Sequence, residues 1–343
     1  MKKAIICLLG FLSALLLSSC SSYNDHNIKN KPVLTYKEVD LHNINSKIFA
    51  NKYYYLELTP NGDVYKYYYV NNTPKKSNGT PELLFSSPDI IDISINGSIA
   101  YLDKNGKVSL YDTEKNKQEE IGYVPNSKSI IIPYNNEKYD FYVLTNNNDL
   151  YVKGSFSGGQ LAKSEIVSQD KFVKVEGIPK IKKIQLCSIL TTDGRLFTQG
   201  LLCNKYKDIY EEKKYNVPII DFADEVNNLI ALGNDGNVYQ YGNVNSGVAN
   251  KDSSELVKVN VATDVIGISG NKKSEYALCR NGEIVFWGNV TINETGKSQK
   301  ESYFTDKIKP FKNPTMIQTA SDKIFIRDND KVYYVYIDVV SEK

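Results

Sequence analysis

The chain has 343 residues, of which 41% are hydrophobic, so it can bury a large core. Its 42 basic and 40 acidic residues leave a formal net charge of +2, and loss of an N-terminal leader carrying Lys2 and Lys3 would reduce this to zero. A nearly neutral chain has no long-range field to gather phosphate, which argues against nucleic acid as the partner. The 26 tyrosines and the recurring Asn-Gly and Asp-Gly pairs predict an all-β protein.

Residues 1–19 have the pattern of a lipoprotein signal peptide. Met1-Lys2-Lys3 is a short positive region, and an apolar run of 14 residues follows it. That run is shorter than the about 20 residues of a membrane-spanning helix, but it is typical of a secretory signal. The tetrapeptide Leu17-Ser18-Ser19-Cys20 then resembles the lipobox of bacterial lipoproteins.

The lipobox resemblance implies cleavage before Cys20, a diacylglycerol on its thiol and a further acyl chain, such as palmitate, on its new amine. Several chains on one residue give lasting anchorage to a membrane. The alternative is an ordinary signal peptide in which Cys20 is accidental. In a diderm bacterium, Ser21 after the cysteine favours the outer membrane. Residues 20–31 are polar and predict a lipidated flexible tether, which leaves residues 32–343 as the folded domain.

A hairpin pattern recurs seven times along residues 32–343. Each copy is an apolar strand, a turn residue that favours positive φ, and a second apolar strand, as in Leu229–Gly242, where Asp235-Gly236 suggests a two-residue turn. The spacings between successive turn residues are 44, 42, 46, 42, 46 and 48 residues. The turn residues that anchor the seven copies are Gly62, Gly106, Asn148, Gly194, Gly236, Gly282 and Asp330.

The repeats predict a seven-bladed β-propeller. Aliphatic residues stand four before and two after every anchor, and further short runs such as Ile219–Phe222 bring each unit to about four strands in about 45 residues. Such small sheets bury both faces only by stacking around an axis. A linear β-solenoid is the alternative, although its repeats are usually shorter. Residues 32–39 form a spare strand, which we expect to complete the last blade and close the ring.

The segment Ile266–Asn289 resembles the repeat of the regulator-of-chromosome-condensation family of propellers. Phe156–Leu161 and Asn245–Val248 are similar to the closing glycine segment of that repeat, although copies one, two and seven lack it. The resemblance covers about residues 40–338 and implies a rigid disc whose loops bind another protein. The usual His-Ser pair before the hairpin is absent, so the nucleotide-exchange role of the eukaryotic member is not implied.

No catalytic, cofactor or metal site emerges from the sequence. Its only histidines are His26 and His42, which provide neither a common metal site nor the base for a serine nucleophile. Asp328-Asn329-Asp330 lacks the Gly and distal Glu of a calcium loop and predicts a plain turn. Three carboxylate pairs could serve a glycosidase, although solvated surface positions are favoured: Glu119/Glu120, Glu211/Glu212 and Asp221/Asp224. A basic group at Lys180, Lys182 and Lys183 is interpreted as a solvated strand edge.

Three cysteines remain after Cys7 and Cys20: Cys187, Cys203 and Cys279. Cys187 and Cys203 flank the fourth hairpin and could form a disulfide, while the alternative is small buried core residues. The Tyr clusters at residues 53–55, 67–69 and 333–336 are expected to pack mostly between blades. The unlike linkers are the better binding candidates: residues 71–87, 112–129, 201–216, 243–255 and 289–305.

The sequence therefore favours a non-catalytic, membrane-anchored propeller of the bacterial cell envelope that binds a protein partner. It needs no cofactor, and we expect a monomeric propeller. The alternative is a carbohydrate-binding or carbohydrate-acting envelope protein that uses the propeller channel. A third interpretation is a structural part of an envelope assembly machine.

Overall fold

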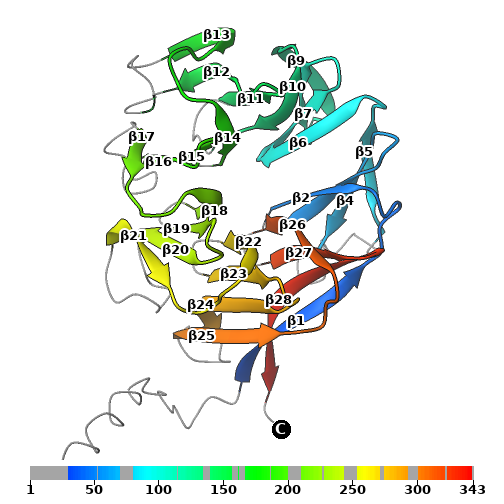
Figure 1. Ribbon diagram of the computed structural model, residues 1–343. Coiled ribbons are helices and arrows are strands. Elements are labelled where there is room, and N and C mark those ends of the chain that lie inside the picture. The colour runs from blue at the N-terminus through cyan, green and yellow to red at the C-terminus, as the bar shows by residue number, and fades with distance from the viewer. Residues whose placement is uncertain are drawn as a thin grey trace, which may run out of the picture.

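The computed structural model shows seven antiparallel four-stranded blades arranged around one axis as a β-propeller (Figure 1). In the part of the chain that it describes, every regular element is a β-strand, and no helix is long and apolar enough to cross a membrane. The described residues are 30–51, 53–69, 80–113, 115–133, 140–156, 161, 167–185, 187–199, 210–225, 228–242, 253–270, 274–292, 300–320 and 323–341.

The strands of each blade follow one another from the axis outward. Blade 1 is β2 (Lys47–Ala50), β3 (Tyr54–Leu58), β4 (Asp63–Tyr68) and β5 (Glu82–Ser86), and blade 2 is β6 (Ile90–Asn96), β7 (Ser98–Asp103), β8 (Lys107–Asp112) and β9 (Lys117–Tyr123). Blade 3 is β10 (Ser127–Ile131), β11 (Phe141–Thr145), β12 (Leu150–Phe156) and β13 (Val167–Lys174), and blade 4 is β14 (Ile181–Ile184), β15 (Ser188–Thr191), β16 (Leu196–Gln199) and β17 (Tyr210–Lys213). Blade 5 is β18 (Ile219–Glu225), β19 (Asn228–Gly233), β20 (Val238–Gly242) and β21 (Ser253–Val259), and blade 6 is β22 (Val265–Gly270), β23 (Ser274–Cys279), β24 (Ile284–Ile292) and β25 (Lys300–Ile308). Blade 7 is β26 (Pro314–Ala320), β27 (Lys323–Asp328), β28 (Lys331–Ser341) and β1 (Asn30–Val39).

The second and third strands of each blade form the predicted hairpins. The first six anchor residues have a positive φ, from 61° at Asn148 to 96° at Gly106. The expected two-residue turn at Asp235-Gly236 is wrong, because the N–H of Gly233 donates to the carbonyl of Asn237 at 3.0 Å and leaves three residues in the loop. The loop is a turn followed by one left-handed residue, a common three-residue hairpin connection.

The seventh hairpin differs from the other six. Asp328 pairs with Lys331, so Asn329 and Asp330 form a two-residue turn, and the positive φ of 55° falls on Asn329. The predicted anchor Asp330 is therefore displaced by one residue. Because successive strand residues point to opposite faces, Phe325 packs towards blade 1 and Ile326 towards blade 6.

The hairpin turns also join consecutive blades. The carbonyl of each of five anchors accepts an N–H from the chain where it enters the next blade, either in the linker, as in Val124 to Gly106 at 2.8 Å, or at the first strand residue, as in Val265 to Gly236 at 3.0 Å. The same bond is made by Ser87 to Gly62, Ile181 to Asn148, and Ile219 to Gly194. The left-handed turn residue thus aims its carbonyl at the neighbouring blade, which explains why the turn recurs so regularly.

The N-terminal strand closes the ring, as predicted. β1 pairs antiparallel with β28 along its whole length, from Asn30 opposite Ser341 to Val39 opposite Val332. Figure 1 shows the two strands side by side, in dark blue and red. The N–H of Leu34 also donates to the Asp306 carboxylate of blade 6 at 2.9 Å. The first and last parts of the chain therefore share one blade, so unfolding of either part opens the ring.

The core is divided among the contacts between blades. Between blades 5 and 6, for example, Ile230 and Leu232 pack with Ala277 and Trp287, and all four are nearly inaccessible to solvent. Each blade thus buries both faces against its neighbours, which is the arrangement that the four-strand repeats require. Outer strands such as β5 and β9, which carry several exposed residues, contribute to the accessible surface at the rim.

Candidate functional site

The structure describes two of the cysteines, Cys187 and Cys279. Cys187 is buried and takes part in a disulfide, whereas Cys279 is a buried free thiol whose pKa is raised by burial. Cys203 lies outside the described residues, so its pairing with Cys187 stays a prediction. Cys20 also lies outside them, and its lipidation stays a prediction as well.

The three carboxylate pairs lie in different surroundings. Glu119 and Glu120 are exposed on β9, as expected for a solvated surface. The expectation is wrong for Asp224, which is 4% exposed and accepts the N–H of Cys187 at 2.9 Å. This bond crosses from blade 5 to blade 4, so Asp224 has a structural role between blades. Glu211 and Glu212 lie at the rim on β17.

The basic residues of β14 connect to the next blade. The Nζ of Lys182 donates to the carbonyl of Ile220, and the Nζ of Lys183 lies 2.7 Å from the Asp221 carboxylate. Lys182 is exposed at the inner edge of its sheet, in agreement with a strand-edge position. Lys183 and Asp221 thus form an ion pair that links blade 4 to blade 5.

The Tyr clusters pack mostly between blades 7 and 1, as predicted. Tyr55, Tyr67, Tyr69 and Tyr334 are buried there with Phe325. The Tyr55 and Tyr67 rings are stacked with centroids 4.6 Å apart. Tyr54 and Tyr333 pack in the contacts of the adjacent blades, and Tyr53 is 56% exposed.

The residues considered for metal binding have structural contacts. The Asp328 carboxylate accepts the N–H groups of Lys312 and Asn313, and the pairing of Asp328 with Lys331 confirms the predicted turn. The Nδ1 of His42 lies 2.9 Å from the Glu57 carboxylate. Among the described residues, no group of three His, Cys, Asp or Glu side chains could hold a metal ion.

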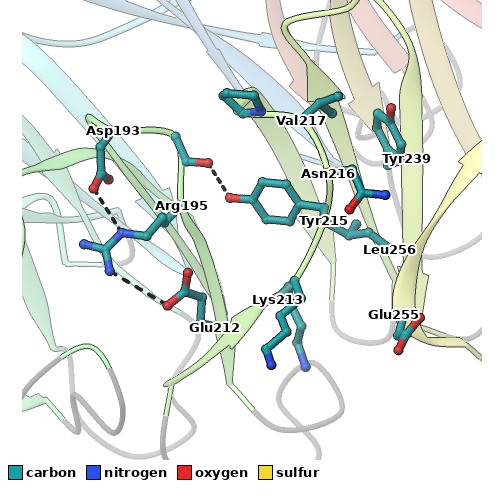
Figure 2. Close-up of a pocket in the computed structure, with 13 residues that line it drawn as sticks. Asp193, Arg195, Glu212, Lys213, Tyr215, Asn216, Val217, Tyr239, Glu255 and Leu256 are labelled. Carbon is teal, nitrogen blue, oxygen red and sulfur yellow. Dashed lines mark hydrogen bonds and ion pairs between the residues drawn. The ribbon is translucent and has the colours of Figure 1, made fainter.

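Among the described residues, a candidate site is a groove at the rim between blades 4 and 5, with a volume of about 760 Å³ (Figure 2). One wall is the fourth hairpin turn and the segment from Glu212 to Pro218, which leads from β17 into β18. The other wall is formed by Tyr239 on β20 and by Glu255 and Leu256 on β21. The groove is therefore built by two adjacent blades and exists only when they are packed together.

Two tyrosine rings line the groove in fixed positions. The Tyr215 hydroxyl donates to the carbonyl of Gly194 in the fourth hairpin, and the Tyr239 hydroxyl donates to the Asp235 carboxylate in the fifth at 2.8 Å. Burial, reinforced by nearby carboxylates, raises the pKa of each tyrosine to about 12. Both hydroxyls thus remain protonated donors at neutral pH. Because these bonds hold the rings, little conformational freedom remains to be lost on binding.

Charged side chains surround the two rings. Arg195 lies between two carboxylates, with its Nε 3.0 Å from Asp193 and a terminal nitrogen 3.8 Å from Glu212 (Figure 2). The hydrogen bond from Thr191 and the charge of Arg195 lower the pKa of Asp193. Lys213 is buried and its Nζ donates to the Tyr241 hydroxyl at 2.9 Å, whereas Lys214 is exposed. Lys214 is thus an exposed cation at the groove.

The predicted linkers locate this site only in part. Residues 201–216 supply one wall through Glu212, Lys214 and Tyr215, and residues 243–255 supply Glu255. Arg195 and Tyr239, which belong to the fourth and fifth hairpins rather than to the predicted linkers, also line the groove. Only the packing of blade 5 on blade 4 brings these two side chains into one site.

The groove has residues suited to binding another molecule. Its described lining residues do not place a nucleophile beside a base. The lining residues that the structure describes include no Ser, Thr, Cys or His side chain. Two of its carboxylates, Asp193 and Glu212, both face the guanidinium of Arg195, whose single positive charge offsets one of their two negative charges. Fixed tyrosines and an ordered arginine are instead among the residue types enriched at binding surfaces.

Comparison with known proteins supports the fold. The sequence matches no family model and no curated protein. Among solved structures, it resembles human WBSCR16 with a TM-score of 0.61 and 14% identity, over 87% of this chain and 88% of that one. It also resembles yeast RCC1 (Prp20), solved with Kap60, with a TM-score of 0.54 and 13% identity over 85% and 80% of the two chains. The Cps50 (Swd1) propeller of Myceliophteria thermophila gives a TM-score of 0.53 and 11% identity, over 89% of this chain and 99% of that one.

These likenesses establish the fold. They include a yeast RCC1, in agreement with the resemblance drawn from the repeats. At 11–14% identity they carry no information about the ligand of the groove.

Proposed function

We propose that this protein is a membrane-anchored, non-catalytic β-propeller that binds a protein partner through its rim. The observation that carries the proposal is the groove between blades 4 and 5, in which Tyr215 and Tyr239 are held by their hydroxyls beside Arg195. Tyr and Arg are enriched among residues that contribute most binding energy. The yeast RCC1 propeller was solved bound to a protein, Kap60. That complex supports the choice of a protein partner here.

The membrane anchor in this proposal is lipid on Cys20. Its support is the lipobox at Leu17–Cys20 after a positive region and a short apolar run. The location is a bacterial cell envelope, and the outer membrane in a diderm species. Because β1 begins at Asn30, the part of the predicted tether (residues 20–31) that precedes this strand is residues 20–29, which would span at most about 36 Å when fully extended.

The place where β1 begins supports one orientation of the anchored disc. Asn30 pairs with Ser341, at the end of β28 that is far from its hairpin turn at Asn329. The tether therefore joins the disc on the face opposite the hairpins. The groove includes the hairpin residues Asp193 to Arg195, so it lies towards the face turned away from the anchoring membrane. A partner would then approach from the aqueous side.

Two experiments test the proposed function. A soluble chain starting at Ser21 is used to capture proteins from envelope extract and is applied in parallel to a glycan array. We expect a reproducible protein partner, whereas capture of glycans without any protein would overturn the proposal and favour the carbohydrate alternative. For the anchor, a palmitate analogue should label the full-length chain in cells, and Cys20→Ala should abolish the label and release the protein from membranes.

A further inference from the structure

We propose that the groove between blades 4 and 5 takes an extended peptide segment of the partner, with an apolar or aromatic side chain between Tyr215 and Tyr239 and an acidic residue beside Lys214. This inference rests on the proposed function and specifies the site and chemistry of binding. The site is a groove of about 760 Å³, which suits an extended segment better than a flat domain surface.

The apolar part of the site accounts for the anchor side chain. Tyr215, Tyr239 and Leu256 pack on the buried cluster beneath them, which contains Leu196, Ile219 and other core residues. One side of this layer thus belongs to the core and the other lines the groove. A partner side chain placed there would bury apolar surface against rings that are already ordered.

The hydroxyl bonds argue for an apolar anchor. Both Tyr215 and Tyr239 use their hydroxyl protons within the protein, on Gly194 and Asp235 respectively. What the rings present to a ligand is therefore mainly carbon surface. A ligand that needed the tyrosine hydroxyls as donors would have to break these bonds, which disfavours it.

The positions of the cations account for the acidic residue. Arg195 is held between Asp193 and Glu212, and Lys213 is turned into the blade against the Tyr241 ring, 4.2 Å from its centroid. Lys214 follows directly on the same wall and is exposed. An acidic side chain next to the anchor residue would pair with Lys214 at the solvent-accessible edge, where such a pair adds specificity more than affinity.

The test uses a random ten-residue peptide library displayed on phage and the soluble chain starting at Ser21. The wild-type chain should enrich peptides with an aromatic or aliphatic residue next to Asp or Glu. Tyr215→Ala should reduce the affinity of an enriched peptide by roughly tenfold or more, as truncation of a central interface residue does. Lys214→Glu should change the preferred neighbour from acidic to basic.

Matched variants separate binding from folding. Tyr123→Ala removes a tyrosine that is 60% exposed at the end of β9, far from the groove, and should leave peptide affinity unchanged. Tyr215→Phe keeps the ring and should bind far better than Tyr215→Ala. Thermal unfolding checks that every variant is folded.

The outcomes distinguish this inference from the proposed function. If the chain captures a protein partner but Tyr215→Ala and Lys214→Glu capture it equally well, the groove is the wrong site while the proposed function stands. If glycans bind in the groove and are lost with Tyr215→Ala, the peptide inference is overturned. If no protein is captured at all, the proposed function fails first.

Discussion

The carbonyl of Gly106 accepts the N–H of Val124 at 2.8 Å, and a Cβ on Gly106 would lie only 2.1 Å from the oxygen of Val124. This hairpin turn is therefore glycine for two reasons, its φ of 96° and the backbone that passes against it. We expect Gly106→Ala to lower the free energy of unfolding by about 3 kcal/mol or more, because the left-handed strain and the clash combine.

Gly236→Ala is the matched control for that substitution. Its φ of 72° is also positive, but the nearest atom to a Cβ there, the Cα of Asp264, is 3.4 Å away. A loss of only about 1 kcal/mol is expected, from the left-handed conformation alone. Urea denaturation of both variants measures the difference, and equal losses would contradict the role given to the Val124 carbonyl.

Glu57 should make the protein less stable in acid. Its buried carboxylate accepts bonds from the N–H groups of His42 and Asn43 and from the hydroxyls of Ser46 and Tyr67. Burial opposes the charge, but these bonds outweigh it and lower the pKa of Glu57 below 4.5. Its contribution is thus present above the unfolded pKa and is lost as pH falls through the lower folded value.

Glu57→Gln tests this prediction. Melting temperatures measured between about pH 3 and pH 7 should depend less on pH in the variant than in the wild type. The variant should also be less stable at neutral pH, since the amide has one oxygen to accept bonds where the carboxylate has two. An unchanged acid dependence would show that Glu57 is not the titrating group.

Glu275 has the opposite pH dependence. It is fully buried between blades 5 and 6, and burial, only partly offset by a hydrogen bond from Asn228, raises the pKa of its carboxyl to about 8. The folded state keeps the proton while the unfolded state releases it near pH 4.5. Stability therefore falls as pH rises between these values, by about 3 kcal/mol up to pH 7.

The amide variant Glu275→Gln removes that loss because it cannot ionise. We expect it to unfold at a higher temperature than the wild type at pH 8 and at nearly the same temperature at pH 4. Differential scanning calorimetry at both values gives the comparison. If the wild type instead unfolds at a higher temperature than Glu275→Gln at pH 8, Glu275 is charged and paired in the folded protein.

The closing strand should be essential for stability. Deleting residues 32–39 removes most of β1, with the buried Leu34 and Val39 and the backbone pairing to β28. The ring then loses the outer strand of blade 7, and we expect the melting temperature to fall by about 10 °C or more. Deleting residues 21–28, which precede β1, is the control and should leave the melting temperature unchanged.

The predicted disulfide can be tested by peptide mapping and reduction. Non-reduced digests should contain one fragment that joins the peptides of Cys187 and Cys203. Because the bond would close a loop of about 15 residues, its removal in Cys203→Ser should cost about 3 kcal/mol of stability. A joined fragment that contains Cys187 and any other cysteine would contradict the pairing.

The number of blades and the closure of the ring could be predicted from the sequence. The aliphatic positions around each anchor are local, since a hairpin is formed by residues close in the chain, and their recurrence reports the repeat directly. The turn at Asp328–Lys331 shows the limit of this reasoning. Two-residue and three-residue loops accept the same Asn and Asp residues, so the sequence leaves the register there open by one residue.

The candidate site required the tertiary structure. The linker of residues 201–216, which contains Tyr215, is a binding candidate from the sequence, but nothing in the fifth repeat distinguishes Tyr239, 24 residues later, from tyrosines that pack in the core. The same is true of Asp224, whose burial follows from contact with Cys187 in the preceding blade. The sequence by itself thus determined the repeating unit, because that unit is made by local strand pairing. Only the packing of one blade on the next decided which side chains are buried and which line a groove.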